Sequence, residues 1–164
     1  MAEEVLRAGM TYDQIVEKYI DTVYRAALAS SATKADADDV VQDVFLKLIT
    51  SDKDFESEEH LKAWLIRVAI NRTRKLFSTS WFKKTVPLSE DIPFQDSEKS
   101  DVFYALRSLP QKYRTPLYLY YYEDYSVREI SECLNISEGT IKSQLARGRG
   151  LMKIKLEGGG DDDR

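Results

Sequence analysis

Apolar side chains recur at intervals of three and four residues in the first half of the chain, and this spacing places them on one face of an α-helix. Thr11 and Gln14 form a capping-box pattern before the first such stretch, aspartates open the second, and Ser57 can cap the third. Three amphipathic helices of this length can share one core. The pattern therefore predicts a small helical domain over residues 1–77, with helices at about 12–27, 36–49 and 57–76.

A linker and a second helical domain are expected after residue 77. From residue 78 to residue 100 the helical spacing stops, and serine, threonine, proline and acidic residues predominate, which is typical of a flexible linker. Helical spacing returns at about Asp101; Pro110 suits the first turn of the next helix, and Pro116 inside it predicts a kink or a tolerant first turn. Because no useful length of sequence alternates like a strand, we expect an all-α fold of two small helical domains. The second would cover residues 101–157 and be followed by a disordered tail at 158–164.

Five tyrosines crowd into residues 118–125. Their rings could stack on nucleic-acid bases, or they could pack in the core of the second domain with the hydroxyl groups reaching the surface. The helical context favours the core.

Residues 126–152 have the layout of a helix-turn-helix. Asn135 stands where the chain must turn sharply and where Asn tolerates a left-handed conformation, and Ser137 can cap the helix that follows. That second helix has an apolar face and, opposite it, a face of small, hydroxyl and basic residues that could enter a major groove. The apolar face consists of Ile141, Leu145, Gly148 and Met152, and the opposite face of Gly139, Ser143 and Arg147, with Lys142, Ala146 and Lys153 beside it.

The net charge of −4 argues weakly against a nucleic-acid partner, because affinity for phosphate depends on Lys and Arg. The charge is unevenly distributed, however: residues 67–84 hold six cations, residues 139–156 hold five, and neither segment contains an acid. Charge alone leaves open whether these are phosphate contacts or solvated helix faces. One face of the third predicted helix could hold a nucleic-acid backbone, and it consists of Arg67, Asn71, Arg74 and Lys75.

The single cysteine and single histidine exclude several classes of protein. They cannot form an intramolecular disulfide, and a structural zinc site would need two further carboxylate ligands. Cys133 is expected in the core, and His60 at the surface or as a cap. No nucleophile with a base, paired acids with a phosphate loop, or metal cluster stands out, so we expect no enzyme and no cofactor. The chain shows neither a signal peptide nor an apolar run that could cross a bilayer, so we expect a cytoplasmic protein without membrane insertion.

Two blocks of the chain, at residues 36–76 and 106–152, together resemble the extracytoplasmic-function group of bacterial sigma factors, within the sigma-70 family. The first block reads DADDVVQDVFLKL and then HLKAWLIRVAINRTRKL, and the second reads LRSLPQKYRTPLYLYYYEDYS before the helix-turn-helix. The resemblance implies a specificity subunit that recruits core RNA polymerase to promoters and helps to melt them. The first domain would be sigma domain two, the second sigma domain four, and the acidic linker would thread the polymerase near the RNA exit path. Expected partners are core RNA polymerase, promoter DNA and an anti-sigma factor.

The resemblance assigns residues of the first domain to two partners. The helix at 36–49 would dock on the largest polymerase subunit, through Asp39, Val40, Gln42, Asp43, Phe45 and Leu46. Acidic side chains beside an exposed Phe or Val suit a basic helical partner, although Phe45 could equally be core. Phe55 could likewise anchor its loop to the core rather than meet DNA. The minus-ten region would meet Asp54, Phe55, Arg67, Asn71, Arg74 and Lys75, with the loop at residues 50–57 holding an unstacked base.

In the second domain, the resemblance assigns the minus-thirty-five element to the second helix of the helix-turn-helix. Gln144 stands where the family commonly has Arg, which weakens salt-dependent affinity, and Gly148 stands where it commonly has Ala, which costs about 1 kcal/mol of helix stability. The promoter sequence therefore cannot be carried over. The residues that the resemblance assigns to the minus-thirty-five element are Ser137, Glu138, Thr140, Lys142, Ser143, Gln144, Arg147 and Arg149.

Two other functions are compatible with the sequence. An ordinary helix-turn-helix regulator would bind DNA without polymerase, but it leaves the block at residues 36–76 unexplained. A sigma-like interaction protein that has lost initiation would titrate core polymerase or an anti-sigma factor.

Overall fold

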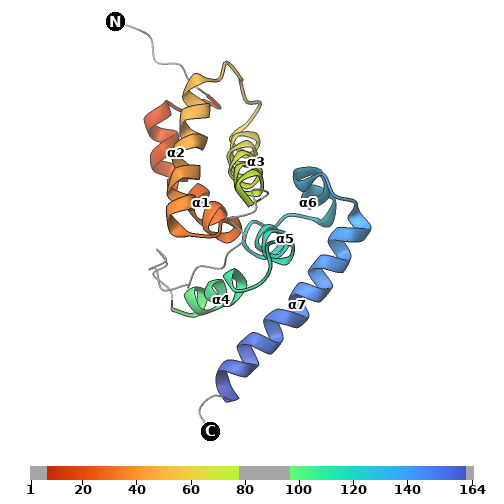
Figure 1. Ribbon diagram of the computed structural model, residues 1–164. Helices are drawn as coiled ribbons and strands as arrows, with labels where there is room; N and C mark the ends of the chain where they lie inside the picture. The colour runs from red at the N-terminus through yellow and green to blue at the C-terminus, as the bar shows by residue number, and fades with distance from the viewer. Residues whose placement is uncertain (1–6, 78–96, 162–164) are drawn as a thin grey trace, which may run out of the picture. The chain divides into compact units, whose positions relative to one another are not determined.

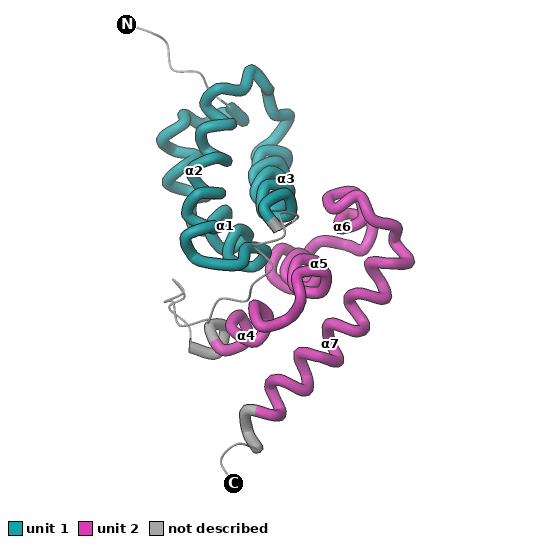
Figure 2. The backbone as a smooth tube through the Cα atoms, viewed as in Figure 1, with its two compact units in different colours: residues 1–85 teal, residues 86–164 magenta. Residues whose placement is uncertain are grey.

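Helices make up the regular structure of the described chain, and the expected all-α fold is confirmed (Figure 1). The computed structural model describes residues 7–77 and 97–161, with side chains at 7–76 and 101–158. The chain divides into two compact units, residues 1–85 and 86–164, which are treated one at a time below (Figure 2). Residues 78–96 of the predicted linker lie outside the described residues. The helices are α1 (Tyr12–Ser30), α2 (Lys34–Thr50), α3 (Glu58–Phe77), α4 (Ser97–Arg107), α5 (Gln111–Tyr122), α6 (Val127–Leu134) and α7 (Glu138–Asp161).

Unit 1 is a bundle in which α1, α2 and α3 all pack on one another. The apolar stripes that the sequence predicts are its core, and burying each of these side chains contributes about 1.5–3 kcal/mol. Because the stripes fix how each helix is rotated, they also decide which residues face outward. The side chains with at most 1% exposure include Ile15 and Val23 of α1, Val40, Val44 and Leu48 of α2, and Leu61, Leu65 and Ile66 of α3.

The helix starts in unit 1 follow from local hydrogen bonds. The Thr11 hydroxyl accepts from the Gln14 backbone N–H at 3.2 Å, and the Gln14 side chain accepts from the Thr11 N–H at 2.9 Å, which confirms the capping box. Ser57 caps α3 by accepting from the His60 N–H at 3.1 Å. Thr33 caps α2, so this helix begins at Lys34, ahead of the expected aspartates.

Unit 2 is built from α4, α5, α6 and α7, and α7 packs against the other three. α7 comes close to α5 at Gly148, where an added Cβ would lie 2.7 Å from Leu117 Cδ1. The glycine therefore has a packing role that the sequence alone did not reveal. The buried residues of unit 2 include Phe103, Leu106, Leu117, Tyr118, Ile130, Ile141 and Leu145, together with Cys133 as expected.

Three helix ends in unit 2 differ from the sequence-based expectation. α4 begins at Ser97 rather than at Asp101, and Pro110 is the N-cap of α5 rather than a residue of its first turn. The prediction of a disordered tail at 158–164 is wrong for 158–161, because α7 continues to Asp161, and residues 162–164 lie outside the described residues. Once a helix is nucleated, each further residue adds one backbone hydrogen bond, and this carries α7 through the glycines.

The tyrosine cluster is only partly in the core. Tyr118 is fully buried, lies edge-on to Phe103 with ring centroids 6.5 Å apart, and donates its hydroxyl hydrogen to Glu123 Oε1 at 2.8 Å. Tyr120 and Tyr121 are 37% and 53% exposed, so the core interpretation fails for these two. They lie at adjacent positions on a helix whose buried face is already occupied by Leu117, Tyr118 and Leu119. None of the described helices combines the length and the apolar character needed to cross a membrane.

Candidate nucleic-acid interface

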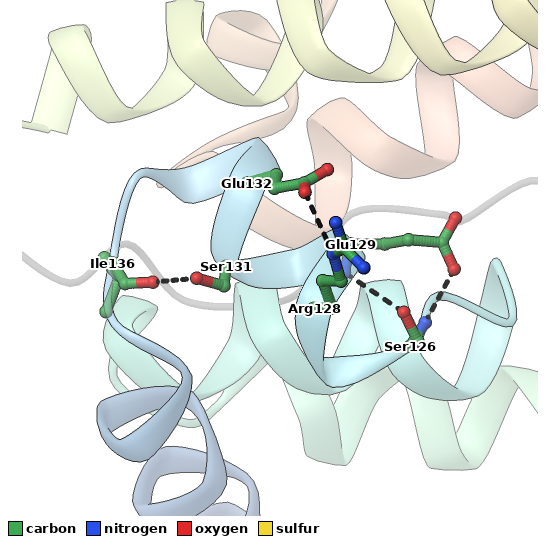
Figure 3. A network of polar contacts seen from close by, with 6 residues as sticks. All are labelled: Ser126, Arg128, Glu129, Ser131, Glu132 and Ile136. Carbon is green, nitrogen blue, oxygen red and sulfur yellow. Dashed lines mark hydrogen bonds and ion pairs between the residues drawn. The ribbon is translucent and has the colours of Figure 1, made fainter.

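The first helix of the helix-turn-helix, α6, is fixed at its start by a second capping box (Figure 3). The Ser126 hydroxyl accepts from the Glu129 backbone N–H at 3.1 Å, and Glu129 Oε1 accepts from the Ser126 N–H at 3.0 Å. Arg128 and Glu132 form an exposed ion pair one turn apart, with Nε and Oε1 3.3 Å from each other. The reciprocal cap defines where α6 starts, whereas the surface ion pair adds little.

The turn between α6 and α7 is tied at Ser131. Asn135 adopts the predicted left-handed conformation, with φ 55° and ψ 49°, and donates its backbone N–H to the Ser131 carbonyl oxygen. The Ile136 N–H reaches the same oxygen at 3.2 Å, and the Ser131 hydroxyl donates to the Ile136 carbonyl at 2.5 Å. This role of Ser131 was missed from the sequence; its signal is a serine placed four residues before the asparagine at the helix end.

α7 starts at the predicted cap. Ser137 Oγ accepts from the Thr140 backbone N–H at 3.3 Å and donates to Thr140 Oγ1 at 2.9 Å. Both hydroxyl groups stay exposed while they hold the helix end. Two of the predicted contact residues therefore also shape the element that presents the others.

Seven of the eight residues assigned to the minus-thirty-five element are exposed on α7 or at its cap, and the eighth, Gln144, is not. The Gln144 side-chain oxygen Oε1 is buried and has no hydrogen-bond partner. The expectation that this amide faces outward is corrected for a geometric reason: Gln144 follows Ile141 by three residues and precedes Gly148 by four, so it borders the apolar face. The opposite face is confirmed as exposed, with Gly139, Lys142, Ser143, Ala146, Arg147 and Lys153.

Two arginines of α7 lie against tyrosines of α5. Arg149 Nη1 donates to the Tyr121 hydroxyl at 3.4 Å. The Arg147 guanidinium, with Lys112 beside it, lowers the pKa of Tyr113 against the opposing effect of burial. The Arg147 side chain remains exposed.

The face of α3 that is predicted to hold a nucleic-acid backbone points outward. Arg67, Asn71 and Lys75 are exposed, and Arg74 is half-buried. Arg72 lies off this face, where its Nε donates to Asp43 Oδ2 of α2 at 2.7 Å. This bond joins the helix assigned to DNA to the helix assigned to polymerase.

The loop between α2 and α3, residues 51–57, is anchored by Phe55. This ring is 5% exposed and lies edge-on to His60 and Trp64, with centroids 5.3 and 5.5 Å away. The alternative interpretation therefore holds, since a buried ring cannot stack on a base, and Phe55 is corrected from a DNA contact to an anchor. Asp54 is exposed, and its Oδ1 accepts from the Phe55 N–H at 2.8 Å. His60 has the expected capping role, with Nδ1 accepting from the Glu56 N–H at 3.3 Å.

The helix assigned to polymerase, α2, presents a different apolar pair from the one expected. Val40 and Phe45 are 0% and 6% exposed, so they belong to the core and not to an outer surface. Leu46 is 60% exposed, as expected, and Ile49 beside it is 55% exposed. Spacing could have identified Ile49, because Asp39, Gln42, Leu46 and Ile49 follow one another at intervals of three and four on the face away from the core.

An apolar groove of about 470 Å³ opens on unit 2 and was not foreseen, because α4, α5 and α7 each supply part of its wall. Tyr121, which is 53% exposed, forms part of its lining. The lining residues are Val102, Leu106, Leu117, Tyr121, Tyr122, Met152 and Leu156, with Arg149, Lys153 and Glu157.

Comparison with known proteins matches both halves of the chain. The Sigma-70 region 2 family matches residues 15–82, and the Sigma-70 region 4 family matches residues 101–152. The ECF RNA polymerase sigma factor SigM of Bacillus subtilis is 31% identical over 170 residues, covering 94% of this chain and 100% of that protein. The RNA polymerase sigma factor SigZ of the same organism is 33% identical over 131 residues, covering 74% of this chain and 73% of that protein.

Two solved structures share the fold. The sigma factor RpoE of Bartonella quintana, in complex with the anti-sigma factor NepR, superimposes with a TM-score of 0.68 at 22% identity, covering 89% of this chain and 96% of that one. CnrH, in complex with the cytosolic domain of CnrY, superimposes with a TM-score of 0.61 at 23% identity, covering 90% of this chain and 88% of that one.

Proposed function

This chain belongs to the extracytoplasmic-function sigma factors of the sigma-70 family, which direct core RNA polymerase to promoters, and we propose that its two units divide promoter recognition between them. Unit 1 carries the region 2 match and unit 2 the region 4 match. The observation that carries the proposal is that each unit turns a face of cations and amide or hydroxyl groups outward, on α3 and on α7. Such groups hold phosphates and read base edges.

In unit 2, α7 reads the minus-thirty-five element in the major groove. The residues nearest its N-terminus, from Ser137 to Ser143, are exposed except for Ile141, and a recognition helix meets base edges with this end. Arg147 follows on the same side, where a guanidinium can take a guanine edge or a phosphate. Gln144 is not part of the proposed contact surface.

In unit 1, α3 holds the minus-ten region through Arg67, Asn71, Arg74 and Lys75, and the loop at 51–57 takes an unstacked base. A captured base offsets the stacking energy that melting a duplex loses. The exposed side chains available to it include Asp52, Lys53 and Asp54, since Phe55 is used as an anchor.

α2 docks on the polymerase through Asp39, Gln42 and Leu46, to which we add Ile49. Two exposed apolar side chains next to acidic and amide groups suit a partner helix with a basic rim. Asp43 contributes less directly, because its carboxylate is bonded to Arg72.

We also propose that an anti-sigma factor holds the chain in the cytoplasm until it is needed, because the related sigma factor RpoE was solved in complex with the anti-sigma factor NepR. The proposed work of the chain is to bind DNA and polymerase, and RNA synthesis belongs to the core enzyme.

Binding of the chain to core polymerase, followed by run-off transcription, tests the proposal. Core polymerase with the wild-type chain should initiate at promoters that core polymerase alone ignores, and Leu46→Ala with Ile49→Ala should weaken core binding. Lys155→Ala, an exposed change in unit 2, is the control that should leave core binding unchanged. If the chain fails to bind core polymerase, the proposal is wrong; tight duplex binding by the isolated chain would favour the helix-turn-helix regulator, and core binding without transcripts would favour the titrating protein.

A further inference from the structure

The segment before α1 folds back on the loop between α2 and α3. Arg7 and Met10 exchange backbone hydrogen bonds of 2.8 and 3.0 Å around a two-residue turn. Both central residues have positive φ, 51° at Ala8 and 77° at Gly9, which is the geometry of a tight hairpin turn. The turn directs the Arg7 side chain to the loop, where Nη1 donates to the Lys53 carbonyl at 2.6 Å and Nη2 to the Ser51 carbonyl.

The rest of the loop is held by bonds of its own. Ser51 Oγ accepts from the Lys53 N–H at 3.1 Å, and Asp54 Oδ1 from the Phe55 N–H at 2.8 Å. The Glu56 N–H donates to His60 Nδ1 at 3.3 Å. The buried Phe55 ring anchors the C-terminal part of the loop. Arg7 holds the N-terminal part, although it lies 44 residues before Ser51 and 46 residues before Lys53 in the sequence.

We propose that Arg7 is a positioning residue for base capture: its two-pronged contact with Ser51 and Lys53 fixes the loop before DNA arrives. This rests on the proposed function, in which the loop takes an unstacked base of the minus-ten region. A loop that is ordered in advance loses less conformational entropy when it binds, so affinity improves without a further contact to DNA. A planar guanidinium suits the task, because it offers two parallel donors to two carbonyl oxygens.

The test compares Arg7→Ala and Arg7→Lys in the full chain with two measurements. The first is amide hydrogen exchange at Lys53, Phe55 and Glu56 in the free chain. The second is the affinity of the holoenzyme for a single-stranded oligonucleotide with the non-template minus-ten sequence that the wild type selects, including versions with each base in turn removed. Arg128→Ala, which removes an exposed cation from α6, is the matched control for loss of charge.

For Arg7→Ala we expect faster exchange at the three loop amides, about tenfold weaker oligonucleotide binding, and a smaller difference between intact and abasic versions. Arg7→Lys should fall between wild type and Arg7→Ala, because one ammonium group lacks the fork geometry. Core binding should be unchanged, as should all properties of Arg128→Ala.

Unchanged loop exchange in Arg7→Ala would overturn the positioning role, and faster exchange with unchanged affinity and base preference would overturn its link to capture. If the wild-type holoenzyme itself shows no base preference, the proposed function of the loop fails, and the exchange measurement still decides whether Arg7 positions it.

Discussion

At the scale of single residues, Gly148 and Gly150 stand two positions apart on α7 and meet different surroundings. An added Cβ at Gly148 would lie 2.7 Å from Leu117 Cδ1, whereas nothing lies within 4 Å of one at Gly150. Gly150→Ala should therefore stabilise the chain by up to about 1 kcal/mol through helix propensity alone. Gly148→Ala should lose that gain to overpacking, which typically costs about 1–3 kcal/mol. Urea unfolding of both variants measures the difference, and equal stabilisation would show that α5 and α7 are not in close contact at Gly148.

Glu58, at the first position of α3, gives unit 1 a dependence on pH. Hydrogen bonds from Lys18 and Tyr19 lower the pKa of Glu58, while burial and the Glu58 carboxylate raise that of Tyr19. A lowered carboxyl pKa means that the stabilisation is complete above the unfolded-state value of about 4.3 and is lost as the pH falls through the folded-state pKa. Glu58→Gln should therefore flatten the fall in melting temperature between about pH 5 and pH 3. Glu59→Gln is the exposed control, and the same flattening in both variants would remove the assignment to Glu58.

Exposure of individual residues was the least predictable property. A stripe of apolar residues shows which face is buried but not how wide it is, so Phe45 was a candidate for both surface and core until packing placed it at 6% exposure. Gln144 differs from expectation in the same way, because it lies at the edge of the apolar stripe and its Oε1 is buried. Arg7 could not be predicted at all, since its partners lie 44 and 46 residues further along the chain.

At the scale of elements, the turn of the helix-turn-helix depends on one backbone conformation. Asn135 has φ 55°, which costs most residues about 1–2 kcal/mol and glycine almost nothing. Asn135→Ala should therefore destabilise the chain by about 1 kcal/mol, and Asn135→Gly should be close to neutral. Denaturant unfolding of the pair is the measurement, and equal effects would mean that the turn relaxes out of the left-handed conformation.

The exposed face of α7 can be tested within one helix by comparing Arg147→Ala with Lys155→Ala. If Arg147 meets a phosphate, its loss should lower the dependence of promoter affinity on salt by about one unit of log–log slope. If it reads a base edge, its loss should cost about 1–3 kcal/mol and relax selectivity at one position. Lys155, two turns further on, should give the smaller effect. Measuring holoenzyme binding to promoter duplex at several salt concentrations distinguishes the two cases. If affinity, salt slope and selectivity all stay unchanged in Arg147→Ala, Arg147 is not part of the interface.

Elements were more predictable than residues because their signals are local. The capping box at Thr11, the caps at Ser57 and Ser137 and the turn at Asn135 each depend on residues within four positions, and the structure has all of them. The start of α4 and the length of α7 were not foreseen, because packing and helix propagation override the weak local preferences there.

At the scale of the whole molecule, the net charge of −4 is an average over unlike parts. Basic faces on α3 and α7 stand on otherwise acidic units, so each offers only a few phosphate contacts. The isolated chain should therefore bind promoter duplex much more weakly than the holoenzyme does at about 0.1 M salt, where charges further apart than about 10 Å are screened. Fluorescence anisotropy with one labelled duplex compares the affinity of the isolated chain with that of the holoenzyme. Equal affinities would show that polymerase is not needed to present the basic faces of α3 and α7 to DNA.

The central claim, that one chain reads two promoter elements for polymerase, is tested most directly by transcription from a library with randomised DNA upstream of the start site. Core polymerase with this chain should yield transcripts from templates that share two sequence blocks at a fixed spacing. Arg147→Ala should alter selection in the upstream block alone, and Asn71→Ala in the downstream block alone. Transcripts whose templates share a single block, or no transcripts from a chain that binds core polymerase, would contradict the account.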